Sequence, residues 1–350
     1  MMSPEEIMSQ ASSPGRSSSG MSRKTKYIIA AIVFCVVLVI VIPTAIALDR
    51  NAKENAAIAE LRTMVVNALK KENVDTSGIE DGSTYQGKAF NWLYFQNPNL
   101  ASMDRTQVLE RFALAALYYA TYQVPTAYTP NPPIWVSSSG WLSSQPVCEW
   151  EGLACSGRGR VDGISLESNA LTGKLPADLA LLREHVTSID ATTNLLYMEP
   201  EDMQFFETMT KLEILLLDDN YIYTDTGLPS SLGACTMLEK LRLSYNLMGG
   251  ELSEDLFAQL TKLTHLEIES NFFTGTMPLS IGKLEGLIYL YMRRNSMSFN
   301  LDFIEGGKMS NLCKSQTLLA NYYRVPYHMR RGYLCRHVVA HTHFSLTISN

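Results

Sequence analysis

Two cysteines lie seven positions apart in the stretch VCEWEGLAC, residues 147–155. Cys148 and Cys155 enclose a tryptophan and a glycine, and two thiols at this distance allow three kinds of chemistry. They could supply half of a metal site, act as a redox pair, or close a structural disulfide. Which of these applies depends on the elements around them and on the compartment in which the chain folds.

Paired carboxylates further along the chain raise the question of acid–base catalysis. Asp218 and Asp219 are adjacent, and Glu267 and Glu269 share one face of an expected strand. Exposed strands carry such residues on their solvated face, so we predict no catalytic site here. The chain contains no H-R-D or D-F-G kinase motif, and the lone G-x-G of SGRGRV has no strand and helix around it. We therefore predict a protein that is not an enzyme and that has no cofactor.

The stretch CRHVVAHTH, residues 335–343, has the residue types of a zinc or copper site. It belongs to an atypical C-terminal tail, residues 299–350, which departs from the repeat pattern of the preceding sequence. We predict no metal site in it. Two alternatives stay open for the tail: a genuine cap closed by a Cys313–Cys335 disulfide, or out-of-frame or intron-derived sequence from a gene model.

An uncharged apolar run from Tyr27 to Leu48 is long enough to cross a bilayer of roughly 30 Å as a helix. Basic residues precede it, so the positive-inside rule keeps residues 1–26 in the cytoplasm and sends the remainder outward. We expect a type II single-pass protein of the plasma membrane, with its repeats outside. Residues 1–26 are rich in serine and are predicted to be a disordered tail.

The alternative to an anchor is a signal peptide cleaved after Ala47, which would make the protein secreted. Both topologies place the rest of the chain in an oxidising compartment, which favours a disulfide at positions 148 and 155. The chain has no N-x-S/T glycosylation sequon, and this weakens the extracellular assignment without overturning it.

Residues 49–134 are predicted to form a helical juxtamembrane region. Ile58, Leu61, Val65 and Leu69 recur at helical intervals, which indicates one buried face. Farther on, Asp104 with a glutamine three places later is a plausible capping pair at the start of another helix. The proline-rich stretch VPTAYTPNPPIW then ends the helical part.

Beyond residue 161 the sequence repeats the pattern L-x-x-L-x-L-x-x-N-x-L at a spacing of 24 to 26 residues. Its asparagines are Asn169, Asn194, Asn220, Asn246, Asn271 and Asn295. The segment x-L-x-L-x predicts a short strand with its apolar side chains pointing into a coil. The asparagine amide can bond the backbone of neighbouring coils and satisfy polar groups that would otherwise be buried. No coil buries its own apolar face, so stacking supplies the core and both ends need caps.

The C-x-W-x-G-x-x-C stretch immediately precedes the first repeat, where an apolar end would otherwise face water. It resembles the N-terminal cap of plant-type leucine-rich repeat (LRR) receptor-like proteins, and the resemblance covers residues 135–298. In that family the two cysteines are bridged and the tryptophan covers the first coil, so the resemblance implies a Cys148–Cys155 disulfide. C-x₆-C is also not the C-x-x-C redox spacing, and no matching second half-site for a metal exists. The upstream AFNWLYF and LERFALAALYYAT, with the apolar run before them, resemble single-pass LRR proteins of diatoms and other stramenopile algae.

The predicted fold is therefore an α/β solenoid. It is a right-handed leucine-rich repeat coil with short parallel strands on its concave face, a helical N-terminal region and one transmembrane helix. The predicted segments are a cytoplasmic tail (1–26), a signal anchor (27–48), the juxtamembrane region (49–134), a disulfide cap (135–160), about six repeats (161–298) and the tail (299–350).

The resemblance and the extended concave surface imply recognition of a protein, peptide or glycan ligand, with a possible co-receptor. A net charge of −6 gives no reason to expect a nucleic-acid partner. The alternative function is a secreted inhibitor or wall-associated scaffold of the polygalacturonase-inhibitor type.

The residue between the second and third apolar positions of each repeat, and the two after the third, are expected on the concave side because strand side chains alternate. The predicted ligand-binding residues are Asp190, Leu216, Asp218, Asp219, Arg242, Tyr245, Glu267, Glu269, Tyr291, Arg293 and Arg294.

Overall fold

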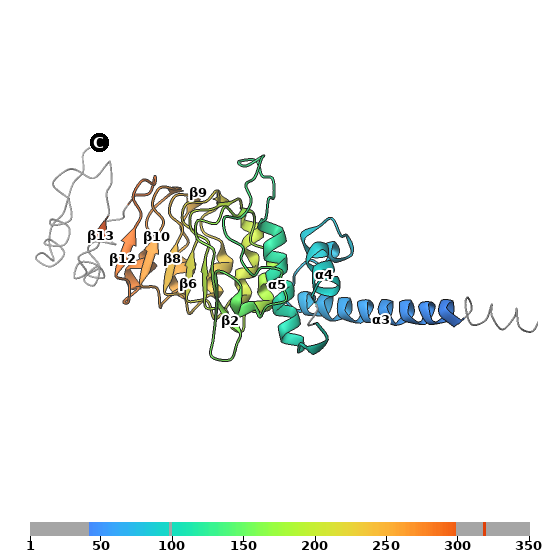
Figure 1. Cartoon of the computed structure of the whole chain (residues 1–350). Helices are drawn as coiled ribbons and strands as arrows, with labels where there is room; N and C mark the ends of the chain where they lie inside the picture. Colours follow the sequence, from blue (N-terminus) through green and yellow to red (C-terminus); the bar gives the residue numbers. More distant parts are fainter. Residues whose placement is uncertain (1–41, 98–99, 299–317, 320–350) are drawn as a thin grey trace, which may run out of the picture. The chain divides into compact units, whose positions relative to one another are not determined.

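A computed structural model describes residues 42–97, 100–298 and 318–319 of the chain (Figure 1). The chain divides into two compact units, Met1–Leu61 and Arg62–Asn350. The elements that follow belong to the second unit, except that helix α3 begins in the first.

The predicted cytoplasmic tail, residues 1–26, and residues 27–41 of the predicted anchor lie outside the described residues. Residues 42–48 of that anchor are the first residues of α3. Across the described ranges, no helix is both long enough and apolar enough to cross a membrane.

Helices and short 3-10 helices precede the repeats. They are α3 (Ile42–Lys71), η2 (Ser77–Glu80), α4 (Tyr85–Phe95), η3 (Leu100–Ser102) and α5 (Arg105–Thr121). The predicted capping pair is present at the start of α5: the Asp104 side chain accepts from the Gln107 N–H, and the Gln107 side chain accepts from the Asp104 N–H. The helix ends at Thr121, before the proline-rich loop.

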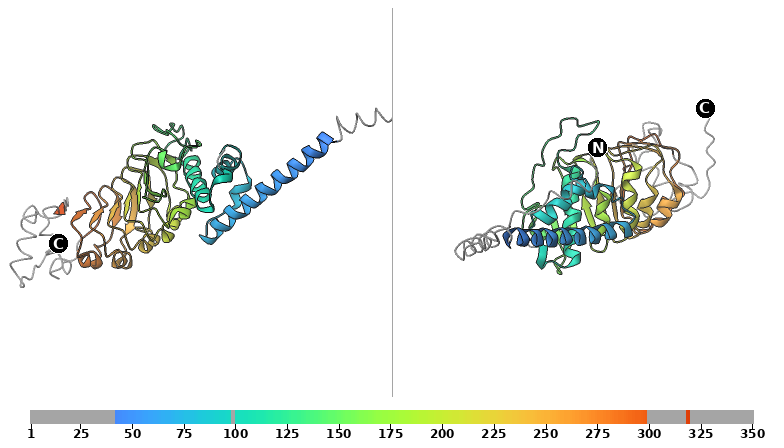
Figure 2. Two further views of the ribbon diagram at one scale, coloured as in Figure 1. Left: turned by 60° about the horizontal axis from the view of Figure 1, so that its bottom comes forward. Right: turned by 90° about the vertical axis from the view of Figure 1, so that its right-hand side faces the viewer.

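The repeats form a sheet to which each coil contributes one short strand (Figures 1 and 2). Its order is β1-β2-β4-β6-β8-β10-β12-β13, and all neighbouring pairs from β2 onward are parallel. The repeat strands are β2 (Val161–Ser165), β4 (Ser188–Asp190), β6 (Ile214–Leu216), β8 (Lys240–Arg242), β10 (His265–Glu267) and β12 (Tyr289–Tyr291). In β4, β6, β8, β10 and β12 the central apolar residue is buried and its two neighbours are more exposed, which is the alternation that the motif predicts.

The return path of each coil supplies the second strand and helical turn that the repeat predicts. Two smaller parallel sheets join β3 (Thr172–Gly173) to β5 (Leu195–Leu196), and β7 (Tyr223–Thr224) to β9 (Leu247–Glu251) and β11 (Phe272–Thr274). The helical turns are η5 (Ala177–Leu182), η6 (Pro200–Thr208), η7 (Ser230–Ala234), α6 (Glu254–Gln259) and η8 (Leu279–Lys283). They lie on the side of the coil opposite the main sheet (Figure 2).

The repeat asparagines link each coil to the one before it. Asn220 Oδ1 accepts from the Leu196 N–H at 3.0 Å, and Asn220 Nδ2 donates to the Ala191 carbonyl at 2.9 Å. The same Nδ2 also bonds carbonyls of its own coil. Equivalent pairs of bonds to the preceding turn are made by Asn169, Asn194, Asn246, Asn271 and Asn295.

The first rung of this ladder has no repeat before it, and the first residues of the predicted cap segment, 135–160, take that place. The Ser137 N–H donates to Asn169 Oδ1 at 2.6 Å, and Asn169 Nδ2 donates to the Ser137 carbonyl at 2.8 Å. The Val136 N–H donates to the Asn169 carbonyl at 3.2 Å. These residues therefore reproduce the backbone contacts of a missing coil.

The disulfide cap adds a strand and an aromatic cluster to the same end. Cys148 and Cys155 are bridged, with η4 (Val147–Glu149) before β1 (Leu153–Cys155), and β1 pairs antiparallel with β2. Trp150 is buried, with its ring centroid 5.8 Å from that of Trp92 in α4 and 5.3 Å from that of Trp141. Trp150 of the cap thus packs against the helical region as well as closing the solenoid.

Helices α4 and α5 close the apolar end of the first coil through buried polar contacts. Glu110 of α5 accepts from the Val161 N–H at 2.8 Å, which satisfies the first backbone donor of β2. Asp178 of η5 accepts from Gln86 Nε2 and Tyr85 Oη, both at 3.0 Å. The helical region and the solenoid therefore share one continuous core within the second unit.

One strand of the predicted atypical tail continues the main sheet. Leu318 and Leu319 form β13, which pairs parallel with β12. The prediction that residues 299–350 depart from the repeat pattern is not tested by these two residues. The other residues of the tail, including Cys313, Cys335 and the histidine cluster, lie outside the described residues.

Replacing Asn220 with alanine should destabilise the solenoid by about 1–3 kcal/mol, because the buried Leu196 N–H and Ala191 carbonyl would lose their partner. The measurement is the urea midpoint of unfolding. Asn131→Ala, at an exposed loop position, is the control and should leave the midpoint in place. Equal midpoints for Asn220→Ala and Asn131→Ala would show that the ladder does not carry stability.

Candidate functional site

The solvent side of the main sheet is called the concave face here. Its strand registers bring one predicted residue of each coil into a single row, the concave row, which is Ser165, Asp190, Leu216, Arg242, Glu267 and Tyr291. Parallel strands lie ~4.8 Å apart, so these side chains are neighbours across coils. Five of the predicted ligand-binding residues thus lie side by side.

A second row on the same face escaped the sequence prediction. The residue two positions earlier on each strand also faces solvent because strand side chains alternate. In three neighbouring coils this row presents Lys240, His265 and Tyr289, and the rings of His265 and Tyr289 stack with centroids 4.3 Å apart. Partial burial, together with Lys240 and Arg242, lowers the pKa of His265. The same alternation that predicted the concave row could have found this second row.

Asp218 was predicted to contact ligand, but only 4% of it is exposed. Its Oδ1 accepts from the Ser244 N–H of the next coil at 2.7 Å. The strand has already ended at Leu216, so the side chain turns toward the neighbouring backbone rather than toward solvent. Asp218 therefore supports the site without presenting a surface to a ligand.

Arg242 lies between two carboxylates of neighbouring coils. Its Nε is 2.7 Å from Asp218 Oδ2 and 3.4 Å from Glu267 Oε2. The shorter contact is an ion pair without hydrogen-bond geometry, because neither of its two atoms has a hydrogen-bond partner. Burial raises the pKa of Asp218 to about 6, opposed in part by Arg242 and the Ser244 amide. Burial also raises the pKa of Glu267, again against Arg242.

The residue before each asparagine leaves the strand geometry altogether. Ser168, Thr193, Asp219, Tyr245, Ser270 and Arg294 all have φ between 54° and 56°. This left-handed conformation is uncommon for residues other than glycine and turns the chain out of the sheet. Strand alternation therefore does not apply to Asp219, Tyr245 and Arg294, which lie at the edge of the concave face rather than on it. We call these six positions the turn column.

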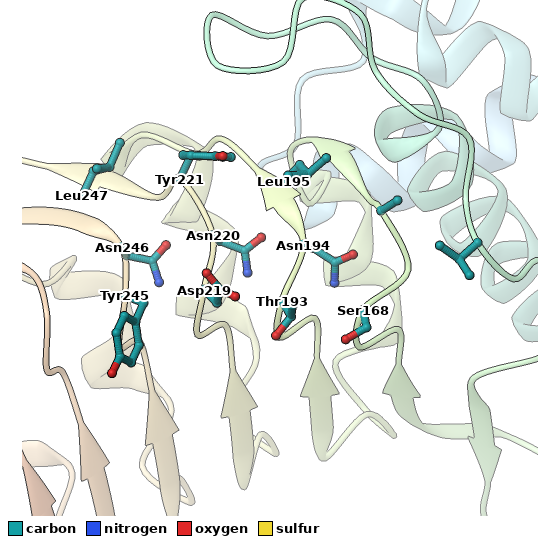
Figure 3. A pocket seen from close by; sticks show the side chains of 12 residues that line it. Ser168, Thr193, Asn194, Leu195, Asp219, Asn220, Tyr221, Tyr245, Asn246 and Leu247 are labelled. Carbon is teal, nitrogen blue, oxygen red and sulfur yellow. The ribbon is translucent and has the colours of Figure 1, made fainter.

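A groove of about 600 Å³ runs along this edge, where each coil turns from the main sheet into its second strand (Figure 3). We call it the lateral groove. It crosses four successive coils and combines turn-column residues with the residues that follow each asparagine. Its lining comprises Val136, Ser168, Ala170, Thr193, Asn194, Leu195, Asp219, Asn220, Tyr221, Tyr245, Asn246 and Leu247. Asp219 and Tyr245 are thus the two predicted ligand-binding residues that line it.

The remaining predicted residues lie beyond the groove. Glu269 and Arg293 follow β10 and β12 and are half-buried, whereas Arg294 is exposed in the turn column. The Tyr245 hydroxyl donates to Glu269 Oε1 at 2.9 Å, which joins the groove to the acidic part of the concave face. Arg293, Arg294 and Tyr291 together give the last described repeat a basic and aromatic character.

The proline-rich loop contributes an aromatic side chain beside the groove. Tyr128 stacks on Tyr221 with ring centroids 5.0 Å apart and lies 5.5 Å from the Tyr197 ring. Because this pairing joins residues 93 positions apart in sequence, no local pattern indicated it. Among the described residues, no group of three or more histidines, cysteines or acids could hold a metal ion.

No protein-family model matches the chain. Two curated relatives come from Arabidopsis thaliana. "Receptor-like protein kinase BRI1-like 3" is 33% identical over 159 residues, 44% of this chain and 13% of the relative. "Receptor-like protein 6" is 27% identical over 168 residues, 46% of this chain and 14% of the relative. The chain thus spans about a seventh of the length of these relatives.

Among solved structures, the LRR ectodomain of the Arabidopsis receptor kinase HAESA, in complex with an N-terminally extended IDA peptide hormone, is 26% identical with a TM-score of 0.43. The match covers 51% of this chain and 29% of that one. The two curated relatives confirm the predicted resemblance to plant-type proteins: the chain is similar to plant receptor-like leucine-rich repeat proteins.

The buried carboxylate predicts a pH dependence of stability. The pKa of Asp218 is raised from an ordinary value of 3.8 to about 6, so its contribution to folding is fully present below pH ~4 and is lost as the pH rises through ~6. The free energy of unfolding of the native protein, relative to Asp218→Asn, should fall over this range by at most ~1.4 kcal/mol per pH unit.

Urea unfolding at a series of pH values measures this difference. Thr193→Ala, a change at an exposed residue of the preceding coil that does not titrate, is the control. Its free energy of unfolding should differ from that of the native protein by the same amount at every pH. A constant difference for Asp218→Asn as well would contradict the burial of an ionisable group at this position.

Proposed function

We propose that this protein is a receptor-like recognition protein that binds an extended ligand, most suitably a peptide, along its concave face. The supporting observation is the change of chemistry along that face. The second repeat carries Asp190 and the fifth carries Glu267 and Glu269, whereas the last described repeat carries Tyr291 and Arg293. A ligand with a basic segment over the central coils and an acidic end at the last repeat is complementary to this surface.

The geometry favours an extended ligand rather than a small molecule. Successive coils present equivalent positions at intervals of ~4.8 Å, so contacts are distributed along the solenoid axis instead of converging on one point. Arg242 is paired with Asp218 and Glu267, and the acidic residues Asp190, Asp218, Glu267 and Glu269 together outnumber Lys240 and Arg242 on the second to fifth repeats. Aromatic and arginine side chains such as Tyr291 and Arg293 are enriched among residues that dominate binding energy.

The predicted membrane anchor, the outward orientation of the repeats and a possible co-receptor are part of this proposal. The alternative, a secreted inhibitor or scaffold, differs in one testable feature. N-terminal sequencing of the mature protein should find residues ahead of position 48 if the anchor is retained. A mature chain that begins at Leu48 would favour the secreted alternative.

Ligand selection tests the recognition function. A random peptide library displayed on phage is panned against the purified full-length chain, and the selected peptides are synthesised and titrated by fluorescence anisotropy. We expect peptides with a basic segment followed by an acidic end. Failure to select any peptide, with folding confirmed by circular dichroism, would contradict the proposal.

Two substitutions on the concave face should weaken the selected peptides. Tyr291→Ala removes an aromatic contact and Arg293→Glu reverses a charge, and each should raise Kd about tenfold or more, equivalent to ~1.4 kcal/mol. Lys283→Glu makes the same charge reversal on η8, away from the concave face, and is the matched control. Similar losses in all three variants would show that binding does not involve the concave face.

A further inference from the structure

The lateral groove contains many asparagines, but their amides are not available to a ligand. Asn194, Asn220 and Asn246 each use both the oxygen and the nitrogen of the amide within the ladder. The side chains that remain for recognition are those of the turn column and of the residues after the asparagines. The chemistry of the groove is therefore set by Asp219 and Tyr245 on one wall and by apolar side chains on the other (Figure 3).

Asp219 is the charged residue of this lining. It is exposed, and within the described residues its carboxylate makes no ion pair and no side-chain hydrogen bond. Its neighbour Asp218 differs in both respects, since that carboxylate is buried and paired with Arg242. The groove thus offers one exposed negative charge that the protein does not neutralise.

Tyr245 occupies the equivalent turn-column position in the next coil. Its side chain is 48% exposed, while its hydroxyl is held by Glu269 Oε1 at 2.9 Å. The hydrogen bond holds the ring toward Glu269 of the following coil, and the bonded carboxylate adds negative potential. Figure 3 shows Asp219 and Tyr245 at equivalent turns of neighbouring coils. A cationic side chain paired with Asp219 would therefore lie one coil away from an aromatic ring, and both a carboxylate and an aromatic ring attract positive charge.

The other wall of the groove is apolar. Leu195, Tyr221 and Leu247 follow the ladder asparagines in successive coils and lie on the second-strand side of the groove (Figure 3). The stacking of Tyr128 on Tyr221 holds that ring in place. An apolar group on the ligand would therefore find contacts opposite the cation position.

We propose that the lateral groove binds a short extended peptide segment whose lysine or arginine side chain lies between Asp219 and Tyr245, with an adjacent apolar side chain against Leu195, Tyr221 and Leu247. This inference rests on the proposed recognition function and names a subsite for it. The groove crosses four coils, so three intervals of ~4.8 Å give it a length of ~14 Å. An extended chain rises ~3.3 Å per residue, so about four to five residues fill it.

The charges around the groove favour a cationic ligand over an anionic one. Glu269 lies behind the Tyr245 hydroxyl, and Arg242 on the adjoining concave face is already paired with two carboxylates. An anionic group would meet Asp219 without a compensating basic side chain among the groove residues. A neutral glycan could stack on the rings but would not need the carboxylate, which makes it separable by experiment.

The test uses the full-length chain and peptides of five to seven residues selected from a phage library. We expect enrichment of lysine or arginine next to an apolar residue. Asp219→Asn should raise Kd for the selected peptides about tenfold, the loss of one charge-assisted contact. Asparagine readily adopts the left-handed backbone of this position, so the variant should fold normally. Asp255→Asn, an exposed carboxylate on α6, is the matched control and should leave Kd unchanged.

A second pair of variants separates the ring from its hydroxyl. Tyr245→Phe keeps the aromatic face and should retain most of the affinity for the selected peptides. Tyr245→Ala removes the ring and should raise Kd about as much as Asp219→Asn does. Higher salt should raise the Kd of the selected peptides more for the native protein than for Asp219→Asn, because only the native groove carries the charge.

The outcomes distinguish this inference from the function on which it rests. Peptides that depend on Tyr291 and Arg293 but not on Asp219 would leave concave-face recognition in place and overturn the groove subsite. Selection of no peptide would overturn both. A neutral oligosaccharide that binds in a glycan array, is lost with Tyr245→Ala and is unaffected by Asp219→Asn would overturn the peptide assignment of the groove.

Discussion

The asparagine ladder is the interaction on which the rest of the structure depends. At each turn out of the main sheet the backbone would leave an N–H and a carbonyl buried between two coils, and each asparagine amide satisfies one of each. Since donor and acceptor belong to the preceding coil, the bonds fix the register between coils as well as satisfying polar groups. That register aligns the concave row and the turn column, and so creates both the extended face and the lateral groove.

The same requirement explains the N-terminal end. Asn169 needs a coil that the repeats do not supply, and Ser137 provides its partners. The loop that carries Ser137 must therefore cross the end of the solenoid, and in doing so it brings Tyr128 onto Tyr221 and Val136 to the groove. Glu110 of α5 completes the closure at the first strand. The helices before the repeats are thus part of the structural unit that shapes the groove.

Features that repeat, or that depend on residues close together in sequence, could be predicted from the sequence. The period of the asparagines predicted the strands, their inward-facing residues and the coil-to-coil bonds, and the cap motif pointed to the disulfide now found between Cys148 and Cys155. The burial of Asp218 could not be read, because it depends on where the strand ends and on an amide of the next coil. The stacking of Tyr128 on Tyr221, and with it the groove, depends on a loop returning from far along the chain. Strand alternation also places Lys240, His265 and Tyr289 on the concave face, although the prediction did not include them.

The central claim is that recognition takes place on the solvent side of the main sheet and its edge, and hydrogen–deuterium exchange with a selected peptide tests it most directly. Amides in the segments from the repeat strands to the turn column, residues 188–193, 214–219, 240–245 and 265–270, should exchange more slowly when the peptide is bound. Exchange in η6, η7 and α6 on the opposite side should be unchanged. Protection confined to those outer helical turns, with none along the strands and the turn column, would contradict the account.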